Sequence, residues 1–122
     1  MEKIDAIISW SGDNYCAHAE IVGVVVDTNL SFEKLKKSFL KTLAFHLDSP
    51  VDDNDINYIV TGSALLKLNE KRLERSTIAK YTGINERQLG HYIQGISQPR
   101  PATDRKIREG FRKIARDLLE YV

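Results

Sequence analysis

Apolar and polar residues alternate along the first part of the chain. Ile4, Ala6, Ile8 and Trp10 are each separated by one residue, which is the period of a half-buried strand. The turn-forming residues 11–14 follow, so we expect the chain to reverse into a second strand over residues 15–20. After a tight connection at residues 21–23, residues 24–28 are mostly β-branched and predict a third strand.

Helical spacing replaces this alternation after Ser31, whose hydroxyl can cap a helix. The apolar residues of that helix recur every three or four positions and predict a stripe that covers one face of the sheet: Phe32, Leu35, Phe39, Leu43 and Leu47. Pro50 stops the helix, and the acidic residues 49–55 form a loop. Residues 57–61 are β-branched and aromatic, so we expect a fourth strand there.

The remaining half of the chain has helical patterns only. We expect a helix from residue 64 to 69, two short helices between residues 76 and 95, a stiff extended joint at residues 99–101, and a last helix. The apolar stripe of that last helix is Ile107, Phe111, Ile114 and Leu118. The sequence therefore predicts an α+β protein with an N-terminal β-β-β-α-β domain over residues 1–62 and an all-α domain over residues 63–122. The boundary is placed at Gly62-Ser63.

The segment from residue 76 to 100 predicts a helix-turn-helix. Ser76 is placed to cap the first helix, Gly83 can end it in the left-handed conformation, and Asn85 is a good N-cap for the second. In the second helix, Leu89, Tyr92 and Ile93 fall on one face and should be buried.

The other face of this second helix predicts contact with DNA. A protruding helix fits the major groove, and its polar side chains can form hydrogen bonds with base edges. Arg87 is a candidate for a guanine, whereas Glu86 could accept from a cytosine or only complement the helix dipole. The predicted DNA-binding residues are Thr77, Asn85, Glu86, Arg87, Gln88, His91, Gln94 and Arg100.

This segment resembles the Cro/phage-repressor (Xre-type) helix-turn-helix. The likeness lies in Ile78-Ala79, Gly83-Ile84-Asn85, Leu89, Tyr92, Gly95 and Gln98-Pro99. The resemblance implies that Glu86, Arg87 and His91 face the bases, and that Thr77 and Gln88 hold phosphates. Two residues depart from the family pattern: Gly90 stands in the middle of the helix, and Ile93 replaces an acidic residue.

The whole chain is similar to the HicB antitoxin family. In these proteins a partial RNase H-like domain precedes a DNA-binding domain. The Pro that this family often has after its second strand is absent, and residues 20–23 stand there instead. The likeness is carried by Trp10-Ser11-Gly12-Asp13, Tyr15, residues 23–27, Ser31-Phe32-Glu33, Ala64-Leu65-Leu66, Gln88-Leu89, His91-Tyr92, Gly95, Pro99-Arg100-Pro101, Ile107 and Gly110.

The resemblance implies a toxin-antitoxin pair. The N-terminal domain would neutralise a small basic HicA-like toxin that cleaves RNA, and the helix-turn-helix would repress the operon by binding its double-stranded DNA operator. Because a helix-turn-helix reads one half-site, we expect a homodimer or a higher homo-oligomer, with the last helix as the dimer element. The alternative is a stand-alone transcriptional regulator whose N-terminal domain senses a small ligand.

Charge divides the chain in the same place. Residues 1–62 hold ten acidic and five basic residues, a net charge of −5, and residues 63–122 hold seven and thirteen, a net charge of +6. A basic half suits a polyanion and an acidic half suits a basic protein. The alternative is chance clustering of solvated charges.

Other chemistry has weaker support in the sequence. An RNase H-like nuclease would need clustered carboxylates, and Asp5, Asp13, Glu20 and Asp27 do not predict a cluster. The three histidines lack metal-ligand spacing, and the single cysteine excludes an internal disulfide. We therefore expect no enzyme activity, no metal and no cofactor. The opening residues lack the apolar region of a signal peptide and no apolar run could span a bilayer, so we expect a cytoplasmic protein without a membrane partner.

Overall fold

The computed structural model describes residues 2–122 and divides them into two compact units, one ending at Val60 and the other running from Thr61 to Val122. Gly62 and Ser63, expected at the boundary, lie inside the first helix of the second unit. The class is α+β: a four-stranded mixed sheet with one α-helix and a short 3-10 helix, followed by helices alone.

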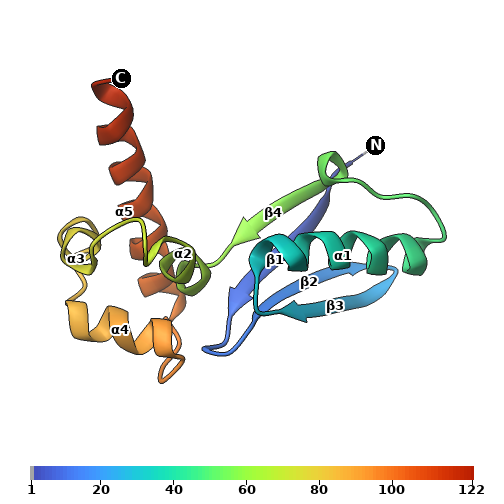
Figure 1. Ribbon diagram of the computed structural model, residues 1–122, viewed down its shortest axis with the longest axis horizontal. Helices are drawn as coiled ribbons and strands as arrows, with labels where there is room; N and C mark the ends of the chain where they lie inside the picture. The colour runs from blue at the N-terminus through green and yellow to red at the C-terminus, as the bar shows by residue number, and fades with distance from the viewer. Residues whose placement is uncertain (1) are drawn as a thin grey trace. The chain divides into compact units, whose positions relative to one another are not determined.

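The first unit, called unit 1 below, is built on a sheet of strands β1 (Ile4–Trp10), β2 (Tyr15–Ile21), β3 (Gly23–Asn29) and β4 (Ile56–Val60). Their order is β3-β2-β1-β4 (Figure 1). Both β1 and β3 run antiparallel to β2, as reversing turns require, whereas β4 runs parallel to β1. A parallel neighbour needs a crossover, and the helix between β3 and β4 supplies it.

Helix α1 (Phe32–Leu47) covers one face of this sheet. The Ser31 hydroxyl accepts a hydrogen bond from the Lys34 N–H, as expected of an N-cap. Burying each apolar side chain of its inner face contributes about 1.5–3 kcal/mol. The fully buried residues are Leu35, Phe39 and Leu43 on the helix and Ala6, Ile8 and Ala17 on the sheet. The three alanines of this face, Ala6, Ala17 and Ala19, let the helix approach the backbone closely.

The acidic segment after α1 is more ordered than a loop. Asp52 and Asp55 cap each other's backbone across a short 3-10 helix, Asp53–Asp55. Tyr58 on β4 donates a hydrogen bond to the Asp53 carboxylate at 2.6 Å. Burial and this bond together raise the pKa of Tyr58 well above its usual value.

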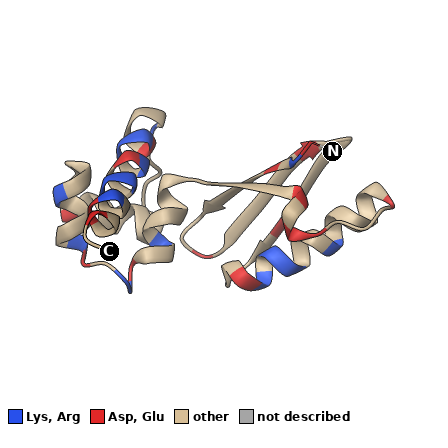
Figure 2. Cartoon of the chain, turned by 90° about the horizontal axis from the view of Figure 1, so that it is seen from above, with Lys and Arg blue, Asp and Glu red and all other residues tan. Residues whose placement is uncertain are grey.

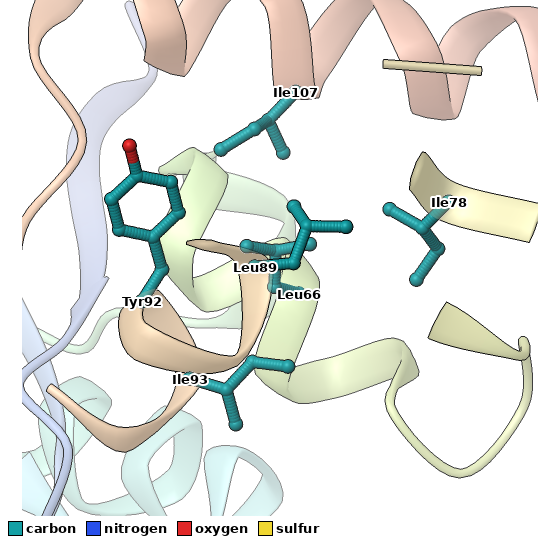
Figure 3. Close-up of a cluster of buried hydrophobic side chains, with 6 residues drawn as sticks. All are labelled: Leu66, Ile78, Leu89, Tyr92, Ile93 and Ile107. Carbon is teal, nitrogen blue, oxygen red and sulfur yellow. The ribbon is translucent and has the colours of Figure 1, made fainter. Parts of the chain in front are cut away.

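The second unit, called unit 2 below, contains helices α2 (Gly62–Asn69), α3 (Arg75–Thr82), α4 (Glu86–Gln94) and α5 (Pro101–Glu120). One residue from each of α2, α3 and α5 and three from α4 form its core (Figure 3). These are Leu66, Ile78, Ile107, Leu89, Tyr92 and Ile93.

Helix α5 is tied to α2 and α3 by hydrogen bonds. The Asp104 carboxylate of α5 accepts the Gly62 N–H at 2.6 Å, which satisfies a free donor at the start of α2, and the Asp117 carboxylate accepts a bond from Tyr81 of α3. Pro101 is the first residue of α5 rather than part of an extended joint, because its fixed φ suits the first helical turn. The expected stripe is buried at Ile107 and Ile114, but Leu118 is 64% exposed.

Within residues 2–122, no helix combines the length and the apolar character needed to cross a membrane.

Candidate nucleic-acid interface

Two helices joined by a three-residue turn form the candidate site. Gly83 ends α3 at φ 73°, and its N–H donates to the Ala79 carbonyl at 2.9 Å. The Asn85 side chain accepts the Gln88 N–H at 2.8 Å and so begins α4. Gly95 ends α4 at φ 78°. These three predicted helix ends are confirmed, because each depends on a local conformation that the residue type favours.

The predicted cap at Ser76 is wrong. Helix α3 begins at Arg75, and its flanking residue Glu74 makes no side-chain cap. The Glu74 carbonyl accepts the Thr77 and Ile78 N–H groups, so Ser76 is already in the first turn. Its hydroxyl lies 3.5 Å from the Glu74 carboxylate instead.

Helix α4 has one buried side and one free side. Leu89, Gly90, Tyr92 and Ile93 are buried against the rest of unit 2. Residues at i, i+4 and i+7 share the opposite side. We call these the α4 outer face: Arg87 and Gln94, both exposed, and the half-buried His91.

Glu86 and Gln88 flank this outer face on opposite sides, because residues two apart on a helix project about 200° apart. Gln88 is half-buried, and its amide donates to the Ser97 hydroxyl at 3.2 Å. That bond ties the segment after α4 to the first turn of α4. Glu86 lines a hollow of about 490 Å³, whose rim also includes Glu70, Glu74, Lys71 and Arg75.

The other predicted DNA-binding residues lie on neighbouring segments. Thr77 is half-buried in the first turn of α3, and Arg100 is exposed immediately before α5. Asn85 is exposed, with its side-chain oxygen engaged in the cap. The side-chain NH2 group of Asn85 can donate to a phosphate while its oxygen holds the cap.

Sequence reasoning missed Arg75, whose guanidinium lies against α4. A Cβ added at Gly90 would be 2.7 Å from the Arg75 Nη1 atom, so the glycine leaves room for this side chain. The only signal in the sequence was a glycine inside a helix that would be better served by alanine. Ser97 and Asp104 were also missed, because their partners Gln88 and Gly62 are distant in the sequence.

Electrostatics favour an anionic ligand for unit 2. It carries the net charge of +6 found from residue 63 onward, since Thr61 and Gly62 are neutral. Figure 2 shows basic residues along much of α5. A phosphate backbone would release counterions on meeting such a surface. On the same helix, Asp117 accepts a hydrogen bond from Tyr81, which raises the pKa of Tyr81.

Two of the carboxylates considered for metal chemistry, Asp5 and Asp27, are engaged in hydrogen bonds within unit 1. Asp27 accepts hydrogen bonds from Ser38 and from the Thr28 N–H, and Asp5 accepts one from Asn57. Among residues 2–122, no three His, Cys, Asp or Glu side chains are grouped to hold a metal ion.

Comparison of the chain with protein-family models, curated proteins and solved structures gave no match. We therefore infer its function from the residues and geometry described above.

Proposed function

We propose that the chain is a HicB-like antitoxin that represses its own operon through a Cro/Xre-type helix-turn-helix formed by α3 and α4. The observation that carries the proposal is the α4 outer face. Arg87, His91 and Gln94 stand on a helix that is buried on its other side and fixed at both ends by Asn85 and Gly95. A rigid helix with a polar free face in a basic unit has the properties of a DNA-recognition element.

Each residue of the interface has a chemical role in this proposal. Arg87 donates two hydrogen bonds to a guanine, and His91 and Gln94 contact neighbouring base edges. Thr77, Asn85, Gln88 and Arg100 hold phosphates and fix the register. Glu86, at the edge of the outer face, accepts from a cytosine amino group.

The topology of unit 1 supports the antitoxin part of the proposal, in which this unit neutralises the toxin. Three antiparallel strands, a crossover helix and a fourth strand parallel to β1 match the expected order of a partial RNase H-like domain. Its excess of acidic residues suits a small basic toxin, whose active surface it would cover.

Dimerisation through α5 is part of the same proposal. Leu118 and Leu119 in the last turn of α5 are 64% and 70% exposed, and Tyr121 just after the helix is 87% exposed, so this end of α5 offers apolar surface to a second copy. A two-fold dimer would place the two α4 helices on half-sites about 34 Å apart along the DNA.

Selection from a randomised duplex DNA library tests the repressor function. We expect enrichment of a two-fold symmetric motif whose half-sites are about one helical turn apart. Failure to enrich any sequence above non-specific binding would contradict it. Co-expression with the product of any short basic reading frame adjacent to that of the chain tests the antitoxin function, and a complex that co-purifies is the expected result.

A further inference from the structure

The face of the unit 1 sheet opposite α1 carries a row of side chains that crosses all four strands and is apolar except on β2. Strand register places Val26 beside His18, His18 beside Ile7, and Ile7 beside Ile59. Val26 and Ile7 are 52% and 42% exposed, and Val24 in the next row is 60% exposed. His18 interrupts the β-branched side chains of this row, but Ile7, Val24 and Val26 leave apolar surface exposed on three strands, and we interpret that surface as an interaction surface. We call it the outer sheet face.

Charge on this surface has one sign. Glu20 and Asp5 lie in the row next to the apolar row, both on the same side of it, and the Glu20 carboxylate lies 3.8 Å from the His18 ring. None of the described strand residues is Lys or Arg. Unit 1 has five lysines. Lys3 lies just before β1, and the other four lie on α1 (Figure 2): Lys34, Lys36, Lys37 and Lys41.

This charge distribution selects the occupant. A nucleic acid would be repelled by the carboxylates and would gain nothing from the valines. A second copy of the same face offers no Lys or Arg from its strands to pair with Glu20 and Asp5, so these carboxylates would gain no opposite charge from it. A basic protein that presents an apolar strip fits both the apolar row and its acidic border.

We infer that the outer sheet face is the surface on which the basic toxin docks. This inference rests on the proposed antitoxin function, and it assigns the contact to β1, β2, β3 and β4 rather than to α1. Ile7 and Val26 contact apolar side chains of the toxin at the centre of the interface. Glu20 and Asp5 pair with Lys or Arg of the toxin at its rim.

The test is a binding titration between the full chain and the product of any short basic reading frame adjacent to its own, by calorimetry after separate purification. The variant Ile7→Lys/Val26→Lys replaces two apolar contacts with charges that repel a basic partner. Phe45→Lys makes the same kind of change at a 91% exposed residue of α1 and is the matched control. Circular dichroism and Trp10 fluorescence check that each variant folds.

We expect the double variant to bind roughly 100-fold more weakly. Phe45→Lys should bind like the wild type, and Glu20→Gln should slow association and reduce its salt dependence. Wild-type binding that the double variant retains would overturn the assignment of this face and leave the antitoxin function intact. A double variant that loses self-association of the chain instead would identify the face as a contact between copies. No binding by the wild type would refute the antitoxin function and this inference with it.

Discussion

Gly110 of α5 lies directly against Thr82 of α3. A Cβ on Gly110 would be 2.5 Å from the Thr82 Cγ2 atom and 3.3 Å from its Cα and N atoms. Thr82 is buried, and its hydroxyl donates to the Ile78 carbonyl at 2.7 Å. Because α3 ends at the next residue, this contact fixes where the turn into α4 begins.

Gly110→Ala should therefore destabilise unit 2. The added methyl group meets backbone atoms that cannot move without shifting α3, and such overpacking costs about 1–3 kcal/mol. The single tryptophan, Trp10, is in unit 1, so its fluorescence follows the unfolding of unit 1 and not that of unit 2. Thermal unfolding should show an earlier far-ultraviolet circular dichroism transition and an unchanged Trp10 transition. An unchanged helical transition would show that α3 and α5 are not packed through this glycine.

Gly90→Ala is the matched substitution with the opposite expected result. Its new methyl group would meet only the tip of the flexible Arg75 side chain, which can swing away at little cost. Alanine is favoured over glycine in a helix interior by up to about 1 kcal/mol. We expect equal or higher stability of unit 2 in the same unfolding experiment. A loss as large as that of Gly110→Ala would mean that Arg75 is held rigidly against α4.

Asn85 and Ser76 test the helix ends. Asn85→Ala removes the bond to the Gln88 N–H and should lower the stability of unit 2 by about 1 kcal/mol. Ser76→Ala should change it by less than about 0.5 kcal/mol, because Ser76 caps nothing. Urea unfolding followed by circular dichroism measures both. Equal losses in the two variants would restore Ser76 as a cap.

The stability of unit 1 should depend on pH through the ionisation of Tyr58. Burial and the bond to Asp53 hold its folded-state pKa above the unfolded value near 10. The stabilisation is therefore complete below about pH 10 and is lost as the pH rises toward the folded-state pKa. Urea titrations followed by Trp10 fluorescence should show Tyr58→Phe to be less stable than the wild type at about pH 8, with a smaller difference at about pH 11. A difference that stays constant between these pH values would contradict the raised pKa.

Local patterns predicted most of the secondary structure. The alternation in β1 and the caps at Ser31, Asn85, Gly83 and Gly95 each depend on a few neighbouring residues, and all are confirmed. The short 3-10 helix at Asp53–Asp55 was missed, because a run of acidic residues after a proline favours a loop and three residues are too few to show a helical period.

The contacts that complete the candidate site were not predictable from such patterns. The bond between Gln88 and Ser97, and the packing of Arg75 on Gly90, join residues that only the folded chain brings together. The parallel pairing of β4 with β1 is equally non-local. Side-chain periodicity gives the face of a helix or strand, but the partner of that face depends on tertiary packing.

The central claim is that the α4 outer face reads duplex DNA, and a fluorescence anisotropy titration of Arg87 variants against the selected duplex tests it most directly. Arg87→Ala should weaken binding by about 1–3 kcal/mol and relax the preference at one base pair, and Arg87→Lys should restore affinity without preference. Arg112→Ala, which removes the same charge from α5, should weaken binding to all sequences alike. Arg87→Ala with unchanged affinity and unchanged base preference would contradict the account.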